Sequence, residues 1–141
     1  MLLSVVVPCY NEEEVIPITH NRLIFVLEEI TPQFELIYID DGSQDETPNH
    51  LRQLQQHDQR VKVVFLSRNF GHQMAITAGL DHVSGDAVVL IDADLQDPPE
   101  VIKEMVNRWY EGYDVVYGVR TDRQGETPFK LWSAKAFYRM M

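Results

Sequence analysis

The chain has 141 residues, of which 45% are hydrophobic and 24% charged, a composition typical of one globular domain with a buried core. Its formal net charge of −10 excludes the basic surface that non-specific nucleic-acid binding requires, so we expect no nucleic-acid partner. The absence of an apolar run of about 18 residues excludes a membrane-spanning helix, and the single cysteine, Cys9, excludes an internal disulfide.

Short apolar runs alternate with longer mixed segments along the chain. In chain order we predict a strand at Leu2–Pro8, a helix at Glu13–Ile30, a strand at Phe34–Asp40, a helix at Thr47–His57, a strand at Val61–Ser67, a helix at His72–Val83, a strand at Ala87–Ala93, a helix at Pro99–Glu111, a strand at Tyr113–Val119 and a helix at Phe129–Met141. Several strands are almost continuously apolar, as in sheets covered on both faces. The alternation predicts an α/β fold with a mostly parallel, Rossmann-like sheet and helices on both faces.

Polar clusters follow the predicted strands. They are Tyr10–Glu12, Asp40–Ser43, Ser67–Asn69, Asp92–Asp94 and Arg120. Ligands of open α/β sheets bind beyond the carboxyl ends of the strands, so we expect all five clusters at one edge of the sheet. Cys9 stands inside the first apolar run, and we interpret it as a small buried side chain in a reducing, cytoplasmic setting.

The most informative cluster ends the run VVLIDADLQDPPE. Asp92 and Asp94 are two residues apart, so in an extended segment both point to the same side. Two such carboxylates repel one another unless a cation lies between them or one holds a proton, and hard oxygen ligands suit Mg²⁺ or Mn²⁺. Gln96 adds a carbonyl oxygen two residues later. For Asp97, which precedes two prolines, we favour a helix cap.

The segment Asp40-Asp41-Gly42-Ser43 has two interpretations. It suits a strand-to-helix turn, in which Gly42 accepts a positive φ, and it also suits an acid that binds a base or ribose. Two acidic strand ends on one edge favour a nucleotide diphosphate bridged by a metal ion. Neither G-x-x-x-x-G-K-[ST] nor G-x-G-x-x-G occurs, so a cation and not a glycine-rich loop must hold such a diphosphate.

Several stretches resemble family 2 glycosyltransferases of the GT-A fold. They are VVVPCYNEEE, YIDDGSQDET, LSRNFGHQMAITAGLDHVSGD, VVLIDADLQDPPE and YDVVYGVRTDR, in the order of the family. More narrowly, the chain is similar to the polyprenyl-phosphate glycosyltransferases, the group of bactoprenol glucosyltransferases and dolichol-phosphate mannose synthase. The third and fourth stretches are most similar to the bactoprenol branch.

The resemblance implies roles for individual residues. Nucleotide-sugar binding is expected from residues in the first four motifs: Pro8, Tyr10, Glu12, Asp40, Asp41, Arg68 and Asp92. Metal binding is expected from Asp92, Asp94 and Gln96, with Mg²⁺ or Mn²⁺ as the cofactor. Asp92, Asp94 and Arg120 are the expected catalytic residues, and Arg120, Arg123 and Lys130 are the candidates for the acceptor phosphate.

The implied reaction is metal-dependent, inverting transfer of a hexose from a nucleotide diphosphate sugar to a polyprenyl phosphate. UDP-glucose is the favoured donor, followed by GDP-mannose and a UDP-linked modified pentose. The acceptor is already an anion, so no strong general base is required. The resemblance further implies a protein at the inner face of the cytoplasmic membrane.

Members of this family are longer than 141 residues, so we interpret the chain as a single GT-A-like domain over 1–141, shortened at its C-terminal end. The alternative is a non-catalytic nucleotide-sugar-binding or interaction module, since the acceptor half is missing; a nucleotidyltransferase is a third, less favoured alternative. The amphipathic segment Phe129–Met141 suits a membrane surface, self-association or packing on the sheet. His72 stands near the expected site, but we interpret it as structural.

Overall fold

The computed structural model describes residues 1–120 and 129–133, and the chain divides into two compact units. The first unit is Met1–Pro99 and the second is Glu100–Met141. The first unit contains, in chain order, β1 (Leu3–Cys9), α1 (Ile16–Ile30), β2 (Phe34–Asp40), α2 (Thr47–His57), β3 (Val61–Phe65), α3 (His72–Leu80) and β4 (Ala87–Leu90). This order confirms the predicted alternation of strands and helices.

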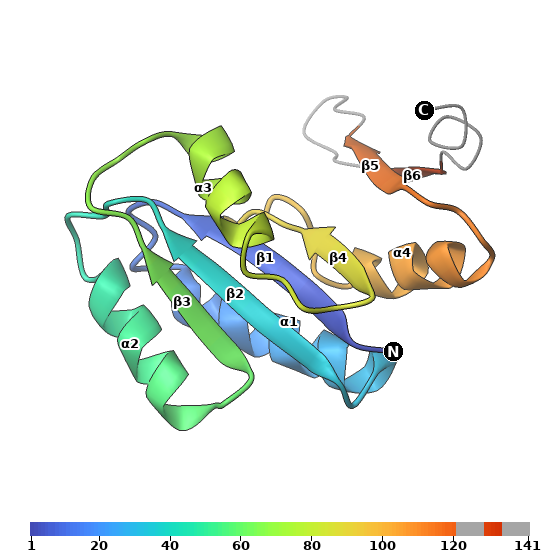
Figure 1. The fold of residues 1–141 in the computed structure, drawn as a ribbon, viewed down its shortest axis with the longest axis horizontal. Helices are drawn as coiled ribbons and strands as arrows, with labels where there is room; N and C mark the ends of the chain where they lie inside the picture. The colour runs from blue at the N-terminus through green and yellow to red at the C-terminus, as the bar shows by residue number, and fades with distance from the viewer. Residues whose placement is uncertain (121–128, 134–141) are drawn as a thin grey trace. The chain divides into compact units, whose positions relative to one another are not determined.

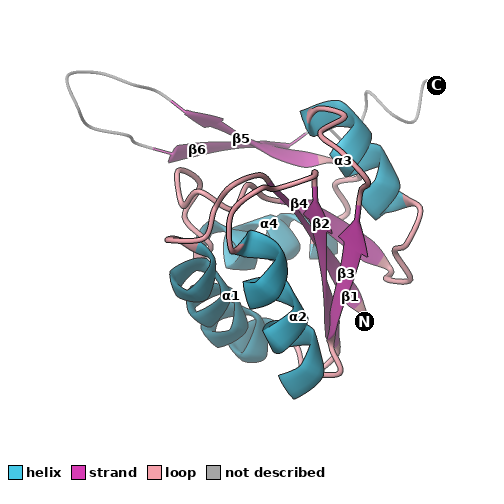
Figure 2. Cartoon of the chain, turned by 90° about the vertical axis from the view of Figure 1, so that its left-hand side faces the viewer, coloured by secondary structure: helices cyan, strands magenta, loops and turns pink. Residues whose placement is uncertain are grey.

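The first unit is a four-stranded parallel sheet in the order β3-β2-β1-β4. The helices α1 and α2 cover one face and α3 covers the other (Figures 1 and 2). The chain therefore winds outward from β1 to β3 and then returns across the opposite face to place β4 beside β1. The strand order reverses between β1 and β4, and at such a switch point the loops of open α/β sheets diverge to leave a crevice.

The core lies along the two central strands. All seven residues of β1 and all seven of β2 are buried, because helices cover both faces. On the α3 face, Val6, Ile37, Ile39 and Ala75 form a cluster. Gly79 brings α3 close to the sheet, since a Cβ at this position would lie 2.5 Å from Cγ1 of Val6.

On the other face a polar contact links α1 to the sheet. Nδ1 of His20 and the hydroxyl of Tyr38 are 2.8 Å apart, and both side chains are buried. Burial lowers the pKa of His20, an effect that Arg60 reinforces and Asp58 opposes. A neutral imidazole therefore packs between α1 and β2.

A buried carboxylate fixes the segment before β4. Glu35 accepts hydrogen bonds from the Ser4 hydroxyl at 2.6 Å, from the Ser84 backbone N–H at 2.7 Å and from Nζ of Lys62 at 2.7 Å. Burial on its own raises the pKa of Glu35, but the hydrogen bonds from Lys62, Ser4 and Ser84 outweigh it and hold the pKa below its usual value. The acid therefore stays ionised and ties the loop before β4 to β1 and β3.

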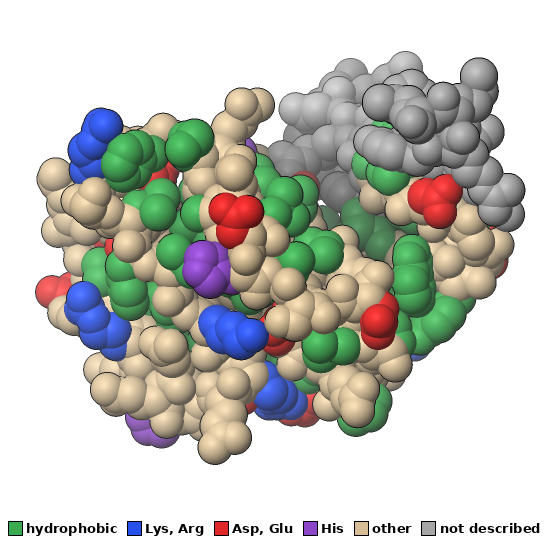
Figure 3. Space-filling view, viewed as in Figure 1, with side chains coloured by type: hydrophobic (Ala, Val, Ile, Leu, Met, Phe, Trp, Pro, Cys, Tyr) green, Lys and Arg blue, Asp and Glu red, His purple; other side chains and the backbone are tan. Residues whose placement is uncertain are grey.

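β4 is less covered than the central strands. Val88 and Leu90 are 40% and 48% exposed, and on α3 the side chains of Met74 and Leu80 are exposed as well. Hydrophobic side chains are accordingly visible among polar ones on the face that α3 occupies (Figure 3). The strand pairs over Ala87–Leu90 and thus ends before Ala93, where the sequence predicts its end.

The second unit contains α4 (Val101–Tyr110), β5 (Val116–Arg120) and β6 (Phe129–Ser133). β5 pairs with β6 in an antiparallel, two-stranded sheet, so the fifth predicted strand is confirmed as a strand but does not join the parallel sheet. α4 has Glu100 as its N-cap and no side-chain cap, so the prediction that Asp97 caps this helix is wrong. Pro99 and Glu100 form a turn, so the helix begins at Val101, two residues later than predicted.

The predicted helix at Phe129–Met141 is wrong over its first five residues, which form β6. Residues 134–141 lie outside the described part of the chain. The short sequence FKLWS is rich in apolar and aromatic residues, which suits a strand, and β5 supplies its hydrogen-bonding partner. Residues 129–133 are therefore not part of the amphipathic helix that was predicted for this segment. No helix in the described ranges 1–120 and 129–133 is long and apolar enough to cross a membrane.

Candidate active site

The loops after β1 and β2 are joined by hydrogen bonds between side chains and backbone. The Asn11 N–H donates to Oγ of Ser43 at 2.9 Å, and the Gln44 N–H donates to Oδ1 of Asn11 at 2.9 Å. The Glu12 N–H donates to Oγ1 of Thr47 at 2.8 Å. Asn11 has a φ of 51°, which an asparagine tolerates. These bonds fix the direction in which the neighbouring Tyr10 and Glu12 leave the strand.

Asp41 holds the loop that follows β3. Its carboxylate accepts the Phe70 N–H at 2.8 Å through one oxygen and the Gly71 N–H at 3.1 Å through the other. Gly42 lies against the same loop with a φ of 70°, and a Cβ there would come within 2.3 Å of the Arg68 carbonyl carbon. The segment Asp40–Ser43 is therefore a turn, as one interpretation predicts, and it also positions a second loop.

The tip of β4 is a turn held by α1. The hydroxyl of Thr19, which is buried, donates to the Ala93 carbonyl at 2.7 Å. The Gln96 N–H donates to Oδ1 of Asp94 at 3.0 Å, and Leu95 has a φ of 63°. The extended geometry predicted for Asp92–Asp94 is thus replaced by a turn. Both carboxylates nevertheless reach the same pocket.

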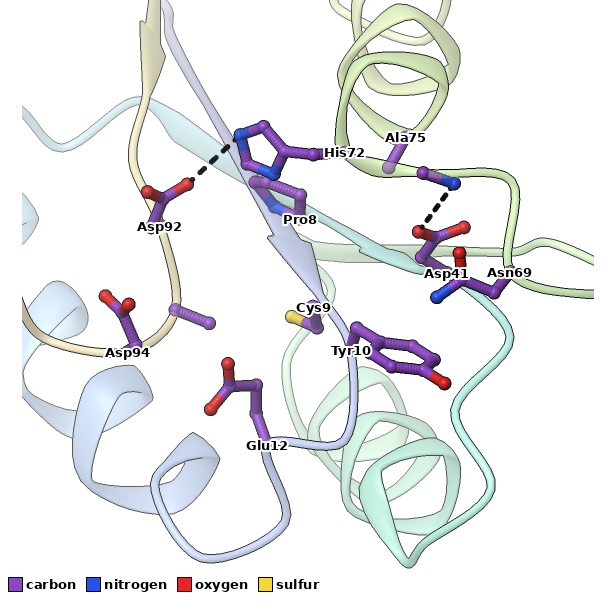
Figure 4. A pocket seen from close by; sticks show the side chains of 12 residues that line it. Pro8, Cys9, Tyr10, Glu12, Asp41, Asn69, His72, Ala75, Asp92 and Asp94 are labelled. Atoms are coloured by element: carbon purple, nitrogen blue, oxygen red, sulfur yellow. Dashed lines mark hydrogen bonds and ion pairs between the residues drawn. The ribbon is translucent and has the colours of Figure 1, made fainter.

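That pocket has a volume of about 350 Å³ and lies beyond the carboxyl ends of β1, β2 and β4. Its lining residues are Pro8, Cys9, Tyr10, Glu12, Asp41, Asn69, Gly71, His72, Ala75, Asp92, Ala93 and Asp94. Figure 4 shows Glu12, Asp92 and Asp94 on one side of it and Tyr10, Asp41 and Asn69 on the other. The pocket therefore has an acidic side and a side with a mixed polar and aromatic surface.

The carboxylates on the acidic side of the pocket repel one another. Burial raises the pKa of Glu12, and the charges of Asp94, Asp45 and Asp92 raise it further. Nε2 of His72 lies 3.5 Å from Oδ1 of Asp92. Cys9 is buried as predicted, and burial together with Asp40 and Glu12 raises the pKa of its thiol. The thiol is therefore neutral and no nucleophile.

The structure brings six predicted site residues into this pocket: Pro8, Tyr10, Glu12, Asp41, Asp92 and Asp94. Asp40 and Arg68 do not line it. Asp40 is buried below the turn, where it accepts the Ser43 N–H at 3.3 Å, and burial raises its pKa. Arg68 stacks on Phe70 with its guanidinium carbon 4.2 Å from the ring centroid.

The structure does not place the other four predicted site residues in the pocket. Gln96 contacts Asp94 through its backbone and does not line the pocket. Arg120 ends β5 and Lys130 belongs to β6, but neither side chain is in the described part of the structure, and Arg123 lies outside it altogether. Their roles stay predictions.

Sequence reasoning missed several residues that build the site. Gly71, His72 and Ala75 line the pocket, although His72 was expected to be structural, and Thr19 holds the β4 tip from α1. Asn69 lines the pocket as well, in agreement with the prediction that the cluster Ser67–Asn69 lies at this edge of the sheet. Nothing in the sequence marks Thr19, whose partner is 74 residues away.

The pocket suits a cation that takes part of its coordination from a ligand. Among the residues that the structure describes, no cluster of three or more His, Cys, Asp or Glu side chains is arranged to hold a metal ion. Asp92 and Asp94 nevertheless place hard oxygen ligands together at the pocket wall. Mg²⁺ and similar ions are commonly bound by one or two carboxylates together with water and substrate phosphates, so these two residues fit such an ion.

Comparison with known proteins establishes the family. The model of glycosyl transferase family 2 matches residues 4–140. The chain belongs to this family. An uncharacterized glycosyltransferase of Bacillus subtilis, YkcC, is 54% identical over 138 residues, which are 98% of this chain and 43% of the relative. The bactoprenol glucosyl transferase of Shigella phage SfX is 43% identical over 99% of this chain and 46% of its own.

A solved structure of a related glycosyltransferase supports the fold. Glucosyl-3-phosphoglycerate synthase from Mycobacterium tuberculosis, in complex with Mn²⁺, UDP and glucosyl-3-phosphoglycerate, matches with a TM-score of 0.57 and 30% identity. The match covers 77% of this chain and 39% of that chain. The predicted GT-A-type α/β sheet is thereby confirmed. This chain spans less than half the length of the curated relatives that it matches.

Proposed function

We propose that this chain carries the donor pocket of a glycosyltransferase that moves a hexose from a nucleotide diphosphate sugar to a polyprenyl phosphate. The observation that carries the proposal is the convergence of Glu12, Asp92 and Asp94 in one pocket at the switch point between β1 and β4. Family membership supports the reaction class. The bactoprenol glucosyl transferase relative supports a polyprenyl acceptor and a glucose donor.

The two sides of the pocket suit the two ends of a sugar nucleotide. On the acidic side, Asp92 and Asp94 would hold Mg²⁺ or Mn²⁺, which as a Lewis acid would neutralise the charge on the departing diphosphate. On the other side, Tyr10 offers an exposed ring and Asp41 a carboxylate to the base. Asp41 already accepts two backbone N–H groups, but an ionised carboxylate has about four acceptor sites, so it retains capacity for a ligand.

The proposed chemistry is a single displacement. An oxygen of the acceptor phosphate attacks the anomeric carbon, the bond from that carbon to the diphosphate oxygen breaks, and the nucleoside diphosphate leaves with the electron pair. The configuration at the anomeric carbon therefore inverts. A phosphate is already anionic at neutral pH and needs no strong base, so the carboxylates of the pocket serve to bind and to stabilise positive charge on the sugar ring. Arg120, Arg123 and Lys130 remain the candidates for the acceptor phosphate.

UDP-glucose is our first choice of donor. The glucosyl transferase from Shigella phage SfX supports the sugar, and the UDP complex of the mycobacterial synthase supports the base. GDP-mannose and a UDP-linked modified pentose are the alternatives. Calorimetric titration of the chain with UDP-glucose and GDP-mannose, each with and without Mn²⁺, distinguishes a UDP-linked from a GDP-linked donor and tests the cation requirement. We expect binding of UDP-glucose that requires Mn²⁺, and the absence of any nucleotide binding would refute the proposal.

Transfer of radiolabelled glucose to a polyprenyl phosphate in detergent tests the enzyme itself. The product should carry the inverted anomeric configuration. Tight, Mn²⁺-dependent binding of the donor without any transfer would instead favour the alternative of a nucleotide-sugar-binding module.

Substitution of one carboxylate on the acidic side of the pocket gives a more specific prediction. Asp94→Ala should abolish the Mn²⁺ dependence of UDP-glucose binding, because it removes one of two carboxylates that the proposal assigns to the ion. The matched control is Asp97→Asn, in the same loop but outside the pocket lining, which should bind as the wild type does. Equal Mn²⁺ dependence in the Asp94→Ala variant and the wild type would rule out this metal assignment.

A further inference from the structure

The pocket that we assign to an anionic ligand has little positive charge of its own. Among the described residues, its lining includes four acids, Glu12, Asp41, Asp92 and Asp94, and no lysine or arginine. His72 is the one residue of this described lining whose side chain can carry a positive charge. A diphosphate entering this pocket meets repulsion from the acids, which a single divalent ion between two carboxylates offsets in part. A hydrogen-bond donor on the pocket wall would offset more.

The fold places His72 at the pocket wall. Asp41 binds the N–H of Gly71, and Gly71, with a φ of 104°, is the N-cap of α3. His72 is therefore the first residue of the helix, and its side chain projects toward Asp92 (Figure 4). Three elements meet here, because Asp41 follows β2, His72 begins α3 and Asp92 follows β4.

The contact between His72 and Asp92 adds little to the stability of the fold. Nε2 and Oδ1 are 3.5 Å apart, which is longer than a good hydrogen bond, and the two side chains are 59% and 46% exposed. Exposed pairs of this kind contribute little to folding stability. The imidazole is thus free of packing constraints that would prevent it from turning toward a ligand.

We propose that His72 is a diphosphate-binding residue of this pocket. An imidazole N–H donates a hydrogen bond to a diphosphate oxygen of the donor, and without a ligand the ring lies beside Asp92, with Nε2 3.5 Å from Oδ1. This inference rests on the proposed function and assigns a residue to one part of the donor.

The test compares ligands with and without the diphosphate. In the presence of Mn²⁺, the affinities of UDP and uridine are measured by calorimetry for the wild type, His72→Ala and His72→Gln; if the chain prefers guanine, GDP and guanosine replace them. Uridine is measured by displacement of UDP. Glutamine restores an N–H donor near the position of Nε2. His82→Ala is the matched control, because His82 follows α3, is exposed and lies outside the pocket lining.

We expect His72→Ala to weaken UDP binding about tenfold, the effect of losing one hydrogen bond to a charged group in a partly exposed site. Uridine affinity should not change, and His72→Gln should recover most of the loss. Unchanged UDP affinity in His72→Ala, or a parallel loss of uridine affinity, would overturn the assignment of His72 alone. A wild type that binds neither UDP nor GDP would overturn the proposed function and this inference with it.

Discussion

Single hydrogen bonds determine where the pocket carboxylates point. Asp92 and Asp94 flank Ala93, whose carbonyl accepts the hydroxyl of Thr19 at 2.7 Å. Thr19 and Ala93 are 1% and 2% exposed, so water does not readily replace this bond. The orientation of both acids therefore depends on a residue of α1 that does not itself line the pocket.

Thr19→Val should loosen the β4 tip. The substitution keeps the shape of the side chain but leaves the buried Ala93 carbonyl without its donor, which we expect to cost about 1–3 kcal/mol of unfolding free energy. Urea unfolding measures this loss, and calorimetry should show weaker Mn²⁺-dependent UDP binding. Thr19→Ser keeps the hydroxyl and is the control for binding. If Thr19→Val matches the wild type in both measurements, Thr19 does not position the tip.

At the residue scale, the sequence predicts side chains whose position follows from a strand end. Tyr10, Glu12, Asp41, Asp92 and Asp94 all come shortly after a strand of the parallel sheet, which brings them together. The sequence does not predict pocket contacts that depend on residues of the helices. The roles of Thr19 and His72 depend on how α1 and α3 pack, which no local pattern reveals.

At the scale of elements, α1 and β2 meet through a polar pair inside an apolar interface. Nδ1 of His20 contacts the Tyr38 hydroxyl, and both residues are at most 7% exposed. Burial disfavours the protonated imidazole, and the lowered pKa of His20 is the result. The packing of this helix on the sheet therefore depends on pH.

The direction of this dependence follows from proton uptake. The unfolded chain protonates His20 near the ordinary histidine pKa of about 6.5, whereas the folded chain does so at lower pH. The stability contributed by the neutral ring is thus full above about pH 6.5 and is lost as the pH falls toward the lowered pKa. Urea unfolding between pH 7.5 and 5 should show a smaller pH-dependent loss for His20→Asn than for the wild type. His57→Asn, at an exposed position on α2, should behave as the wild type; equal slopes in all three would contradict the prediction.

Helices and strands were predictable from the sequence where one hydrophobic periodicity, either helical or strand-like, dominates a segment. The helix at Thr47–His57 is confirmed with the same bounds, because a polar turn precedes it and an apolar-rich strand follows. Phe129–Ser133 was predicted as a helix because apolar and basic residues are mixed over the longer segment to Met141, as in an amphipathic helix. Over five residues the same letters also fit a strand, and pairing with β5 decides in favour of β6.

At the scale of the whole molecule, the fold follows from the order of strands and helices, and the net charge constrains the function. Right-handed crossovers between parallel strands place α1 and α2 on one face and α3 on the other. A chain with a net charge of −10 repels an anionic donor unless local positive charge compensates. The sequence alone did not reveal that the chain divides into two units after Pro99. It also did not reveal that β5 pairs with β6 in a two-stranded sheet of its own.

The most direct test of metal-held donor binding is an anomalous difference map from a crystal of the chain soaked with Mn²⁺ and UDP-glucose. We predict a manganese peak within coordination distance, about 2.0–2.3 Å, of carboxylate oxygens of Asp92 and Asp94, with diphosphate oxygens completing its shell. A fully bound nucleotide in another place, with no peak beside these two residues, would contradict it.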